Sequence, residues 1–452
     1  MCISRSYLVT GRNQIKKEKA PLMMIIRPSL IALAVAVAGT PLAMASQADS
    51  KGFVEGSSLT LTNRNYYFNH DRKDGRDDSH DWAHALLLDY ASGFTQGPVG
   101  FGVDAFAHGV LKLDGRNGGA GNLHVNNDGE TDSFAGVGAS VKLRLSETTL
   151  KYGILQPYNP VLAAAGSRIK PQKARGFELT SNEISDLSLQ AGHFTAATGY
   201  RGNSTHDVML ALYAGIEADS VDYLGGDYRI NDNLSASLYA SEYEDVWRQY
   251  YTNLNYSLPL ADAQSLGLDF NLYRSKDTGS ADAGEVDNTA WSLAGSYAFG
   301  AHKLTLGYQQ VDGDEPFDYV GFGSEGSAGY SIYLANSVHF SDFNGPGEKS
   351  VQLRYDLDMA DYGVPGLSFM LRHLQGDDID GSKADAAGAY AGYYGSNDEE
   401  RETDLEAKYV FQSGELKDLS LRVRQAWHRG SASTGGYQNQ FRLMVEYPMN
   451  LL

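Results

Sequence analysis

Four cationic side chains near the C-terminal end of the sequence have the type and spacing to bind carboxylates. They are Lys408, Arg422, Arg424 and Arg442. A guanidinium group can donate two parallel hydrogen bonds to a carboxylate, so each arginine is a potential stop for an anionic solute. Conduction requires stops that attract the solute and still release it, and several moderate sites meet that need better than one deep site. The chemistry that this set suggests is the stepwise passage of carboxylates.

The residues around these cations alternate between apolar and polar. The apolar members are Leu419, Leu421, Val423 and Trp427 in the stretch 419–429, and Phe441, Leu443, Val445, Tyr447 and Met449 in the stretch 440–452. Because successive side chains of a strand point to opposite faces, both stretches are predicted strands with one apolar face and one face that carries arginines. Neighbouring strands lie ~4.8 Å apart, which would set the four cations in one column.

Two environments fit strands of this kind. In a soluble sandwich the apolar face would pack on a core and the arginines would face bulk water. In an outer-membrane barrel the apolar face meets lipid and the arginines line a water-filled lumen. Within a barrel a further alternative stays open, in which the cations are scattered lumen charges paired with Asp404, Glu406 or Glu446.

The composition favours many short amphipathic strands. The 452 residues include 50 glycines and 29 tyrosines but only 12 prolines, and strand-like segments follow one another without a convincing amphipathic helix. Their connections are tight at 261–265, 300–302 and 414–418, and they are long, polar and glycine-rich at 71–79, 114–132, 275–288 and 376–403. Short turns at one end and long loops at the other are typical of transmembrane barrels. The sequence thus predicts an all-β fold, a transmembrane antiparallel β-barrel with long extracellular loops. A net charge of −19 argues against a nucleic-acid partner.

The first 45 residues are predicted to be removed from the working protein. The segment 23–45 has a basic start, an apolar run over 30–38 and the small-x-small pattern AMA at 43–45, which together indicate a secretory signal peptide. We expect cleavage after Ala45, with residues 1–22 an over-long start and residues 46–452 the barrel; an uncleaved anchor helix is the alternative. The only cysteine, Cys2, falls within the removed part, so the barrel would hold together without disulfides. No cluster of cysteines or histidines suggests a metal site, and no cofactor is expected.

One stretch, residues 160–171, departs from the alternation. It is apolar over 160–165 and carries Arg168 near its end. Exposed loops are usually polar, so we predict that this loop folds into the barrel, narrows the pore and presents Arg168 to the lumen. An external loop that packs on its neighbours is the alternative.

Ordered blocks along the chain resemble those of a known family. They include GFVEGSSLTLTNRNYYFN after the signal, SGFTQGPVGFGVDAF, GSRIKPQ, AGHFT, NLSASLYASEYEDVWRQYY, PFDYVGFG, LANSVHFSDFNGPGEKS and LEAKYVFQSGELKDLSLRVRQAWHR. From about Gly52 to Leu452 the chain resembles the outer-membrane porin D (OprD) family of Gram-negative bacteria. The resemblance implies a monomeric barrel of about 18 strands in the bacterial outer membrane, a substrate-specific channel for passive diffusion of small carboxylate-bearing nutrients. One branch of that family prefers basic amino acids and admits carbapenem antibiotics, and another prefers cyclic or aromatic carboxylates.

The resemblance also implies a site. Lys408, Arg422, Arg424 and Arg442 look like part of the family's basic ladder, and Arg168 in GSRIKPQ resembles a further rung. Across the pore, a pocket that accepts amino groups would correspond to Tyr213, Tyr319, Ser337 and Asp342. Two positions depart from the basic-amino-acid branch, because Phe340 stands in place of a tyrosine and Tyr330 in place of an acid. Both changes remove polar groups from the side that would receive a cation, so we expect a neutral or aromatic carboxylate to suit the pore better than arginine.

Other functions compete with the channel. His193, Asp245 and Ser331 can be drawn as a serine-protease triad, and the resemblance brings a suggested protease side activity at similar positions. No G-x-S-x-G elbow surrounds Ser331 and spacing alone cannot show contact, so a channel without enzyme activity is the expected function. An adhesin would have a plugged lumen, which inward cations argue against. The partners expected of the channel are small carboxylate-bearing solutes, outer-membrane lipid and the barrel-assembly machinery.

Overall fold

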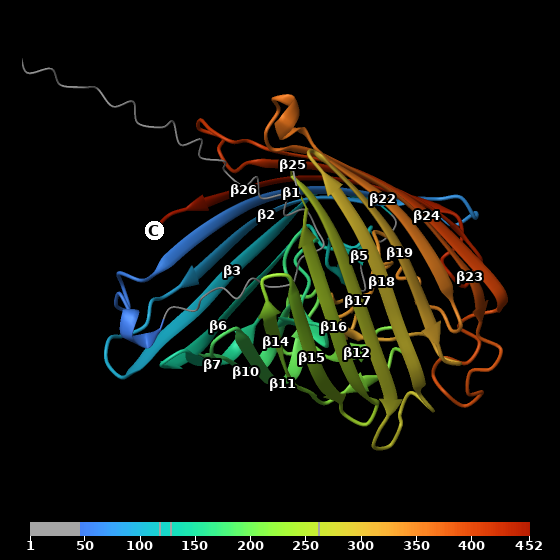
Figure 1. Cartoon of the computed structure of the whole chain (residues 1–452), viewed down its shortest axis with the longest axis horizontal. Coiled ribbons are helices and arrows are strands. Elements are labelled where there is room, and N and C mark those ends of the chain that lie inside the picture. Colours follow the sequence, from blue (N-terminus) through green and yellow to red (C-terminus); the bar gives the residue numbers. More distant parts are fainter. Residues whose placement is uncertain (1–45, 117–118, 127–128, 261–262) are drawn as a thin grey trace, which may run out of the picture. The chain divides into compact units, whose positions relative to one another are not determined.

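The chain forms a closed antiparallel sheet of eighteen strands in the part that this computed structural model describes, residues 46–116, 119–126, 129–260 and 263–452 (Figure 1). Each strand pairs with the next one along the chain, and the last pairs with the first. The expected antiparallel barrel is thereby confirmed. The signal peptide expected in residues 1–45 lies outside the described residues. The barrel strands are β1 (Ser58–Arg72), β2 (Ser79–Ala91), β3 (Val99–Arg116), β6 (Ser133–Leu145), β7 (Thr148–Leu155), β10 (Lys173–Ile184), β11 (Leu187–Thr198), β14 (Val221–Asn231), β15 (Leu234–Tyr243), β16 (Trp247–Pro259), β17 (Gln264–Asp277), β18 (Asp287–Phe299), β19 (His302–Asp312), β22 (Lys349–Asp358), β23 (Leu367–Asp380), β24 (Ser396–Val410), β25 (Ser420–Gly430) and β26 (Gln438–Asn450).

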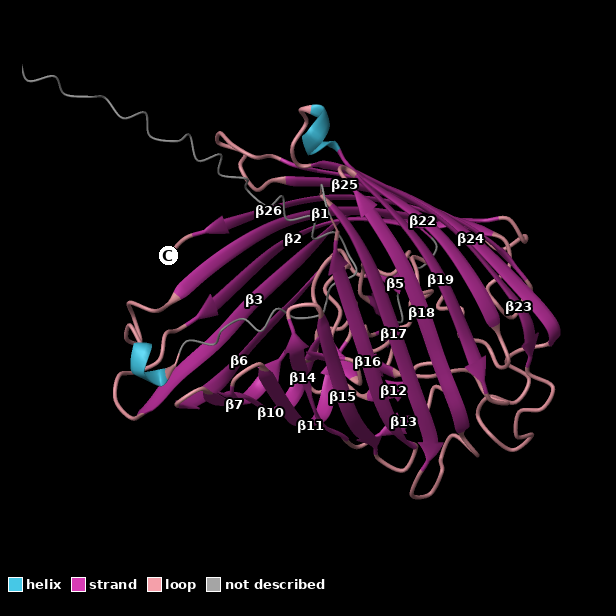
Figure 2. Cartoon of the chain, viewed as in Figure 1, coloured by secondary structure: helices cyan, strands magenta, loops and turns pink. Residues whose placement is uncertain are grey.

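The remaining elements are short and belong to the connections. Figure 2 shows how little of the described chain is helical, namely η1 (Gln47–Asp49) and η2 (Met359–Tyr362). No helix among the described residues is long and apolar enough to cross a membrane. Three small sheets complete the set: β4 (Val125–Asn126) with β5 (Gly129–Glu130), β8 (Tyr158–Asn159) with β9 (Leu162–Ala163), and β13 (Glu217–Ala218), β12 (Met209–Ala211), β20 (Val320–Phe322) and β21 (Ser327–Ala328).

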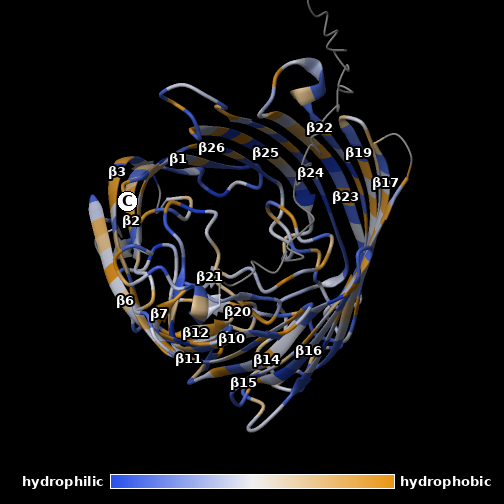
Figure 3. Cartoon of the chain, turned by 60° about the vertical axis from the view of Figure 1, so that its left-hand side comes forward, coloured by the Kyte–Doolittle hydropathy of each residue, from blue (hydrophilic) through white to orange (hydrophobic). Residues whose placement is uncertain are grey.

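The two faces of the barrel wall differ in the way that the alternation predicts. On β25 the apolar Leu421, Val423 and Trp427 are each 38% exposed on the outer face, whereas His428 on the inner face is 1% exposed. Figure 3 shows the same alternation of apolar and polar residues along most strands. Because the sheet is closed, it has no unpaired strand edge, and its apolar outer face suits the hydrocarbon of a membrane.

The connections are short at one end of the barrel and long at the other. Short turns such as residues 146–147 and 185–186 alternate with long loops, of which 156–172, 199–220 and 313–348 are the longest. The loop expected over 376–403 is wrong at both ends, because β23 continues to Asp380 and β24 already begins at Ser396. The apolar alternation stops there because the outer face no longer meets hydrocarbon. The hydrogen-bonded pairing of the two strands nevertheless continues. By the usual pattern the long loops are extracellular and the short turns periplasmic.

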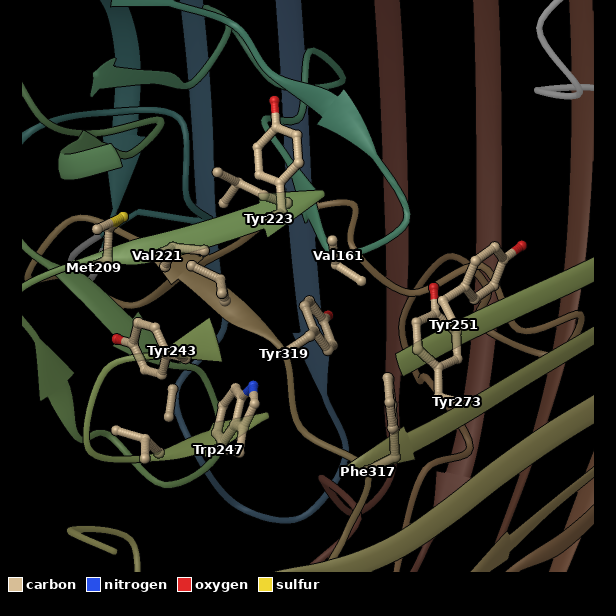
Figure 4. Close-up of a cluster of buried hydrophobic side chains, with 14 of the residues drawn as sticks. Val161, Met209, Val221, Tyr223, Tyr243, Trp247, Tyr251, Tyr273, Phe317 and Tyr319 are labelled. Carbon is tan, nitrogen blue, oxygen red and sulfur yellow. The ribbon is translucent and has the colours of Figure 1, made fainter. Parts of the chain in front are cut away.

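Part of the barrel interior is filled by a core of buried side chains. Figure 4 shows strand residues such as Tyr223, Tyr243 and Trp247 packed with Val161 and Tyr319 from the long loops. These strand residues come from β14 to β16, and in the closed ring β14 lies nine strands from β25 in either direction. The loops therefore fill much of the lumen along the wall opposite the arginine-bearing strands.

Candidate functional site

Strand register sets the four predicted cations in two adjacent rows of the inner wall. Lys408 on β24 lies directly opposite Arg422 on β25, and Arg424 lies opposite Glu406 on one side and Arg442 on the other. Alternate residues of a strand are ~6.6 Å apart, so the two rows form consecutive steps along the lumen. The structure thus brings together the four cations that the alternation placed on one face.

These cations are not all free. Glu406 accepts a hydrogen bond from Arg424 Nε, and its other oxygen lies 3.7 Å from Arg422 Nε. Lys408 has no ion-pair partner among the described residues. The alternative of paired lumen charges therefore describes Arg424 well and Arg422 in part. A carboxylate placed between two cations offsets the repulsion between their positive charges.

Phe68 on β1 extends the row of Arg424 and Arg442, and its ring contacts two guanidinium groups. Phe68 lies directly opposite Arg442, whose Cζ is 4.4 Å from the ring centre, and Arg168 Cζ lies 4.6 Å from the same ring. Arg442 also donates to the carbonyl of His339 (2.8 Å) and to Gln440 Oε1 (2.6 Å). Arg168 Nη1, in contrast, is buried and has no hydrogen-bond partner among the described residues. A buried donor without an acceptor is uncommon in proteins and marks a place where a ligand or water can bind.

The loop that carries Arg168 does fold into the barrel. Val161 to Ala165 and Ile169 are almost completely buried. Arg64 on β1 donates from Nη1 to the carbonyls of Gly166 (3.1 Å) and Arg168 (2.6 Å), and Tyr273 on β17 donates to the carbonyl of Pro160 (3.0 Å). The loop 156–172 is therefore held by walls on both sides of the lumen, which confirms that it folds into the barrel; we refer to it as the constriction loop. Arg64 was missed in the sequence, although it stands on the same face of its strand as Tyr66 and Phe68.

The second predicted set meets around one carboxylate. Tyr213 and Tyr319 each donate a phenolic hydrogen bond to Asp342 Oδ2 (2.8 and 2.7 Å), and Ser337 donates to Oδ1 (2.6 Å). Burial, and then the charge of Asp342, raise the pKa of both tyrosines well above the usual value, so they act as donors. The structure thus assembles all four residues of the expected pocket, in the loops 199–220 and 313–348.

A short segment joins this pocket to the cation rows. The backbone N–H groups of Phe340 and Ser341 donate to the two oxygens of Glu402 on β24 (2.9 Å each), and Arg442 holds the carbonyl of His339. Asp342 is three residues from His339, a chain length that spans at most ~11 Å. Cations and carboxylate therefore border the same narrow path. Glu402 is part of an alternating acidic face, 400 to 406, that the sequence displayed without indicating what it holds.

A buried aspartate organises the pocket from behind. Asp318 accepts hydrogen bonds from the N–H groups of Tyr213 and Ala214 (3.0 Å each), from its neighbour Tyr319 (2.7 Å) and from the hydroxyl of Tyr390 (3.0 Å). Burial raises the pKa of Asp318 to about 6 although these four donors act in the opposite direction. Three loops are joined through one side chain, and no local sequence pattern signals it.

The two departures noted in the sequence lie in different places. The ring of Phe340 packs on His428, with 4.5 Å between ring centres, while its backbone is bound to Glu402. Tyr330 is part-exposed and its phenol lies within electrostatic range of Arg422, Arg424 and Arg442. Tyr330 thus borders the cation rows.

The drawn protease triad is dispersed. His193 pairs with Asp222 (Nδ1 to Oδ1, 2.9 Å), Asp245 accepts from the N–H of Ser280 (3.0 Å), and the buried Ser331 accepts from the N–H of Ala163 (2.9 Å). Within the described part of the chain, none of the three hydrogen bonds to another member of the set. The described residues contain no group of His, Cys, Asp and Glu arranged to hold a metal ion.

Comparisons with known proteins agree on one family. The profile of the outer membrane porin, OprD family, matches residues 51–451. Porin D of Pseudomonas aeruginosa is 55% identical over 443 residues, which cover 95% of this chain and 100% of that protein. A crystal structure of Pseudomonas aeruginosa OprD is similar with a TM-score of 0.81 at 54% identity, covering 90% of this chain and 99% of that one. The crystal structure of Pseudomonas aeruginosa OccK2 (OpdF) in complex with glucuronate is similar with a TM-score of 0.77 at 34% identity, covering 90% of this chain and 100% of that one.

Proposed function

The chain belongs to the OprD family of outer-membrane porins, and on that premise we propose that its lumen selects small solutes that carry a carboxylate. Amino acids, short peptides and aromatic carboxylates are the nutrients of this kind, and carbapenem-type antibiotics share the same group. The solute diffuses down its own gradient, and its carboxylate moves between the basic ladder residues Arg168, Lys408, Arg422, Arg424 and Arg442. The relative solved with glucuronate, a sugar carboxylate, supports this solute class.

The observation that carries the proposal is the unpartnered donor of Arg168. Its Nη1 is buried in the constriction, beside a phenylalanine ring that it shares with Arg442. A guanidinium group held in this way is oriented before the solute arrives and has hydrogen bonds to give, and carboxylates fit its planar geometry. Lys408, without an ion-pair partner in the described chain, supplies a second cation within the same column.

The Asp342 pocket is proposed to receive the ammonium group of a zwitterion. The hydroxyl groups of Tyr213, Tyr319 and Ser337 donate to Asp342, which leaves their own lone pairs to accept from a solute. The segment 339–342 places this pocket within ~11 Å of the carbonyl that Arg442 binds, so an amino acid can address both sides. Aromatic carboxylates need only the cationic side.

Uptake into liposomes by the purified channel tests the proposal. The panel is arginine, proline, benzoate and glucuronate, with an uncharged sugar as the reference for pore size. Arg168→Gln is expected to lower uptake of all four solutes by about tenfold and to spare the sugar, because one charged hydrogen bond is lost in the constriction. Asp342→Asn is expected to lower arginine and proline uptake and to leave benzoate uptake unchanged.

Two outcomes would contradict the reasoning. If Arg168→Gln takes up benzoate as fast as the parent channel, the constriction does not bind carboxylates. If the parent takes up arginine alone, the expectation drawn from Phe340 and Tyr330 is wrong, and the Asp342 side governs selectivity.

The remaining sequence expectations are proposed together with this function. We propose that residues 1–45 are removed before insertion, that the barrel-assembly machinery inserts residues 46–452 as a monomer, and that outer-membrane lipid covers the apolar outer face. N-terminal sequencing of the purified protein should begin at Ser46, and native mass measurement should give a single barrel. A longer N-terminus or a trimer would overturn the respective part.

A further inference from the structure

A second pocket opens in the barrel wall away from the cation rows and the Asp342 pocket. It has a volume of about 270 Å³, and its lining includes Asp89, Asp104, Phe106, Lys151 and Lys173. These residues come from β2, β3, β7 and β10, and Ser58 and Thr60 of β1 complete one side. Since Thr60 shares the face of Arg64 and Phe68 on β1, the pocket faces the lumen. We refer to it as the exit pocket.

Small residues create this hollow. In the register, Phe106 is flanked by Asp89 and Gly138, and the next row runs from Asp104 to Ser140 and Gly153. A Cβ atom on Gly138 would lie 2.4 Å from Phe106 Cε1, so only glycine lets that ring lie along the wall. The inner face of the wall therefore lacks side-chain bulk at this place, and charged side chains surround the resulting hollow.

The charges of the exit pocket are unevenly satisfied. Asp104 is paired with both Lys142 and Lys151, the latter at 3.3 Å. Lys173 has no carboxylate partner among the described residues, and its Nζ lies 3.4 Å from Gln156 Oε1 and 4.7 Å from the centre of the Phe106 ring. This ammonium group is free to bind an anion.

An acceptor for a cation stands in the same pocket. Among the described residues, Asp89 pairs only with His108, whose Nε2 lies 3.3 Å from Asp89 Oδ1, and the Asp89 side chain is half exposed. A half-exposed carboxylate can accept a further hydrogen bond from a solute. A free ammonium and a half-free carboxylate on one small cavity are the complement of a zwitterion.

The exit pocket borders the constriction loop on its short-turn side at β1. Thr60 is four residues from Arg64 toward the short-turn end of β1, a distance of ~13 Å along the strand. Arg64 itself holds the constriction loop through its carbonyl groups at 166 and 168. On the other side of the exit pocket, Gln156 and Lys173 lie at the two ends of the constriction loop, so the pocket borders that loop and extends from it toward the short-turn end along β1.

We propose that the exit pocket is a second binding site, which holds an α-amino-acid zwitterion with its carboxylate on Lys173 and Lys151 and its ammonium group on Asp89. The inference rests on the proposed permeation of such solutes and adds a separate stop on the periplasmic side. A cavity of about 270 Å³ is just below the usual range of small-molecule sites, which fits one amino acid and excludes a peptide. Phe106 offers its face to the apolar part of the solute.

Single-channel recording in planar bilayers tests the proposal, because solute can be added to either side of a channel of known orientation. The readout is the half-saturating concentration for current block by L-proline. Lys173→Gln is expected to raise it about tenfold for proline on the short-turn side and by less than about twofold on the long-loop side. Arg424→Gln is expected to show the reverse asymmetry, and Lys173→Arg should restore the parent behaviour.

Benzoate separates the two charges of the pocket. Asp89→Asn is expected to weaken block by proline on the short-turn side and to leave block by benzoate unchanged, because benzoate has no ammonium group. Equal effects of Lys173→Gln on both sides, or none, would overturn the exit pocket while the Arg424→Gln result still supports the ladder. If Arg424→Gln leaves uptake and block unchanged, the proposed function fails, whatever Lys173→Gln does. Heat-dependent gel mobility confirms that each variant is a folded barrel before it is recorded.

Discussion

Removal of the Glu406 carboxylate should make the channel more selective for anions. Glu406 is bonded to Arg424 and lies 3.7 Å from Arg422, so it neutralises part of the charge of the two adjacent rows that carry Lys408, Arg422 and Arg424. Glu406→Gln keeps the size of the side chain and takes away one negative charge. The positive charges of the three cations are then no longer offset by this carboxylate.

The size of the effect follows from Coulomb's law. A unit charge about 7 Å from a passing carboxylate is worth about 0.6 kcal/mol at the dielectric constant of water and about 2.4 kcal/mol at an effective value of 20. A wet lumen lies between these limits, so we expect a gain of about 1 kcal/mol, or about fivefold in affinity for benzoate. The reversal potential in a salt gradient should shift in the anion-selective direction, and high salt should reduce the shift.

Glu400→Gln is the matched control. Glu400 faces the lumen on the same strand and is hydrogen-bonded to His428 Nε2 (2.8 Å), whereas Glu406 contacts two arginines. It stands six residues from Glu406, ~20 Å along the strand, which is more than twice the screening length at physiological salt. If the two variants shift the reversal potential equally, or if Glu406→Gln lowers anion preference, then Glu406 acts by positioning Arg424 and the charge argument is refuted.

Three further predictions concern the loops. We expect no hydrolytic activity to be lost in Ser331→Ala. The substitution should lower the stability of the purified channel by about 1–3 kcal/mol, because the buried N–H of Ala163 loses its acceptor. An unchanged melting curve would contradict this. Glu402→Gln should increase open-channel current noise, since a glutamine side chain has a single acceptor oxygen and one of the two N–H groups at 340 and 341 loses its acceptor. Quiet recordings like those of the parent would show that the loop is held elsewhere. The folded form binds the Asp318 proton more tightly than the unfolded form does, so loop stability should be highest at low pH, fall as the pH rises from 3.8 to about 6, and stay level above. Hydrogen exchange in the loops measures this slope, which Asp318→Asn should abolish; stability that rises over that range would refute it.

The sequence predicted the wall better than it predicted the loops. Alternation at 419–429 and 440–452 placed Arg422, Arg424 and Arg442 on the inner face. A strand in a barrel has only two faces, and the apolar one contacts lipid. Register then decides which cations meet, and the pairing of Arg424 with Glu406 follows from it. Periodicity cannot supply that register across a connection of unknown length.

The loop contacts were beyond the reach of any local pattern. Asp318 meets Tyr213, which is 105 residues away in sequence, and its role depends on how three loops fold against each other. The pocket around Asp342 was identified through family resemblance alone. The exit pocket was invisible for another reason, since its defining feature is the absence of side-chain bulk at Gly138 and Ser140, and small residues in a strand look like weak propensity and not like a site.

The first and last strands meet at the ladder, and this has a consequence for how the channel comes into being. Arg442 and Phe68 are neighbours across the junction of β26 with β1, and the Arg64–Glu446 pair bridges the same junction two rows further on. The strand cations of the proposed ladder therefore belong to the C-terminal end of the barrel, and Phe68 and Arg64, which contact them and the constriction loop, belong to its first strand. The proposed ladder is complete only when β26 pairs with β1, so a barrel that is open at this junction would lack both a sealed lumen and the contact between Arg442 and Phe68.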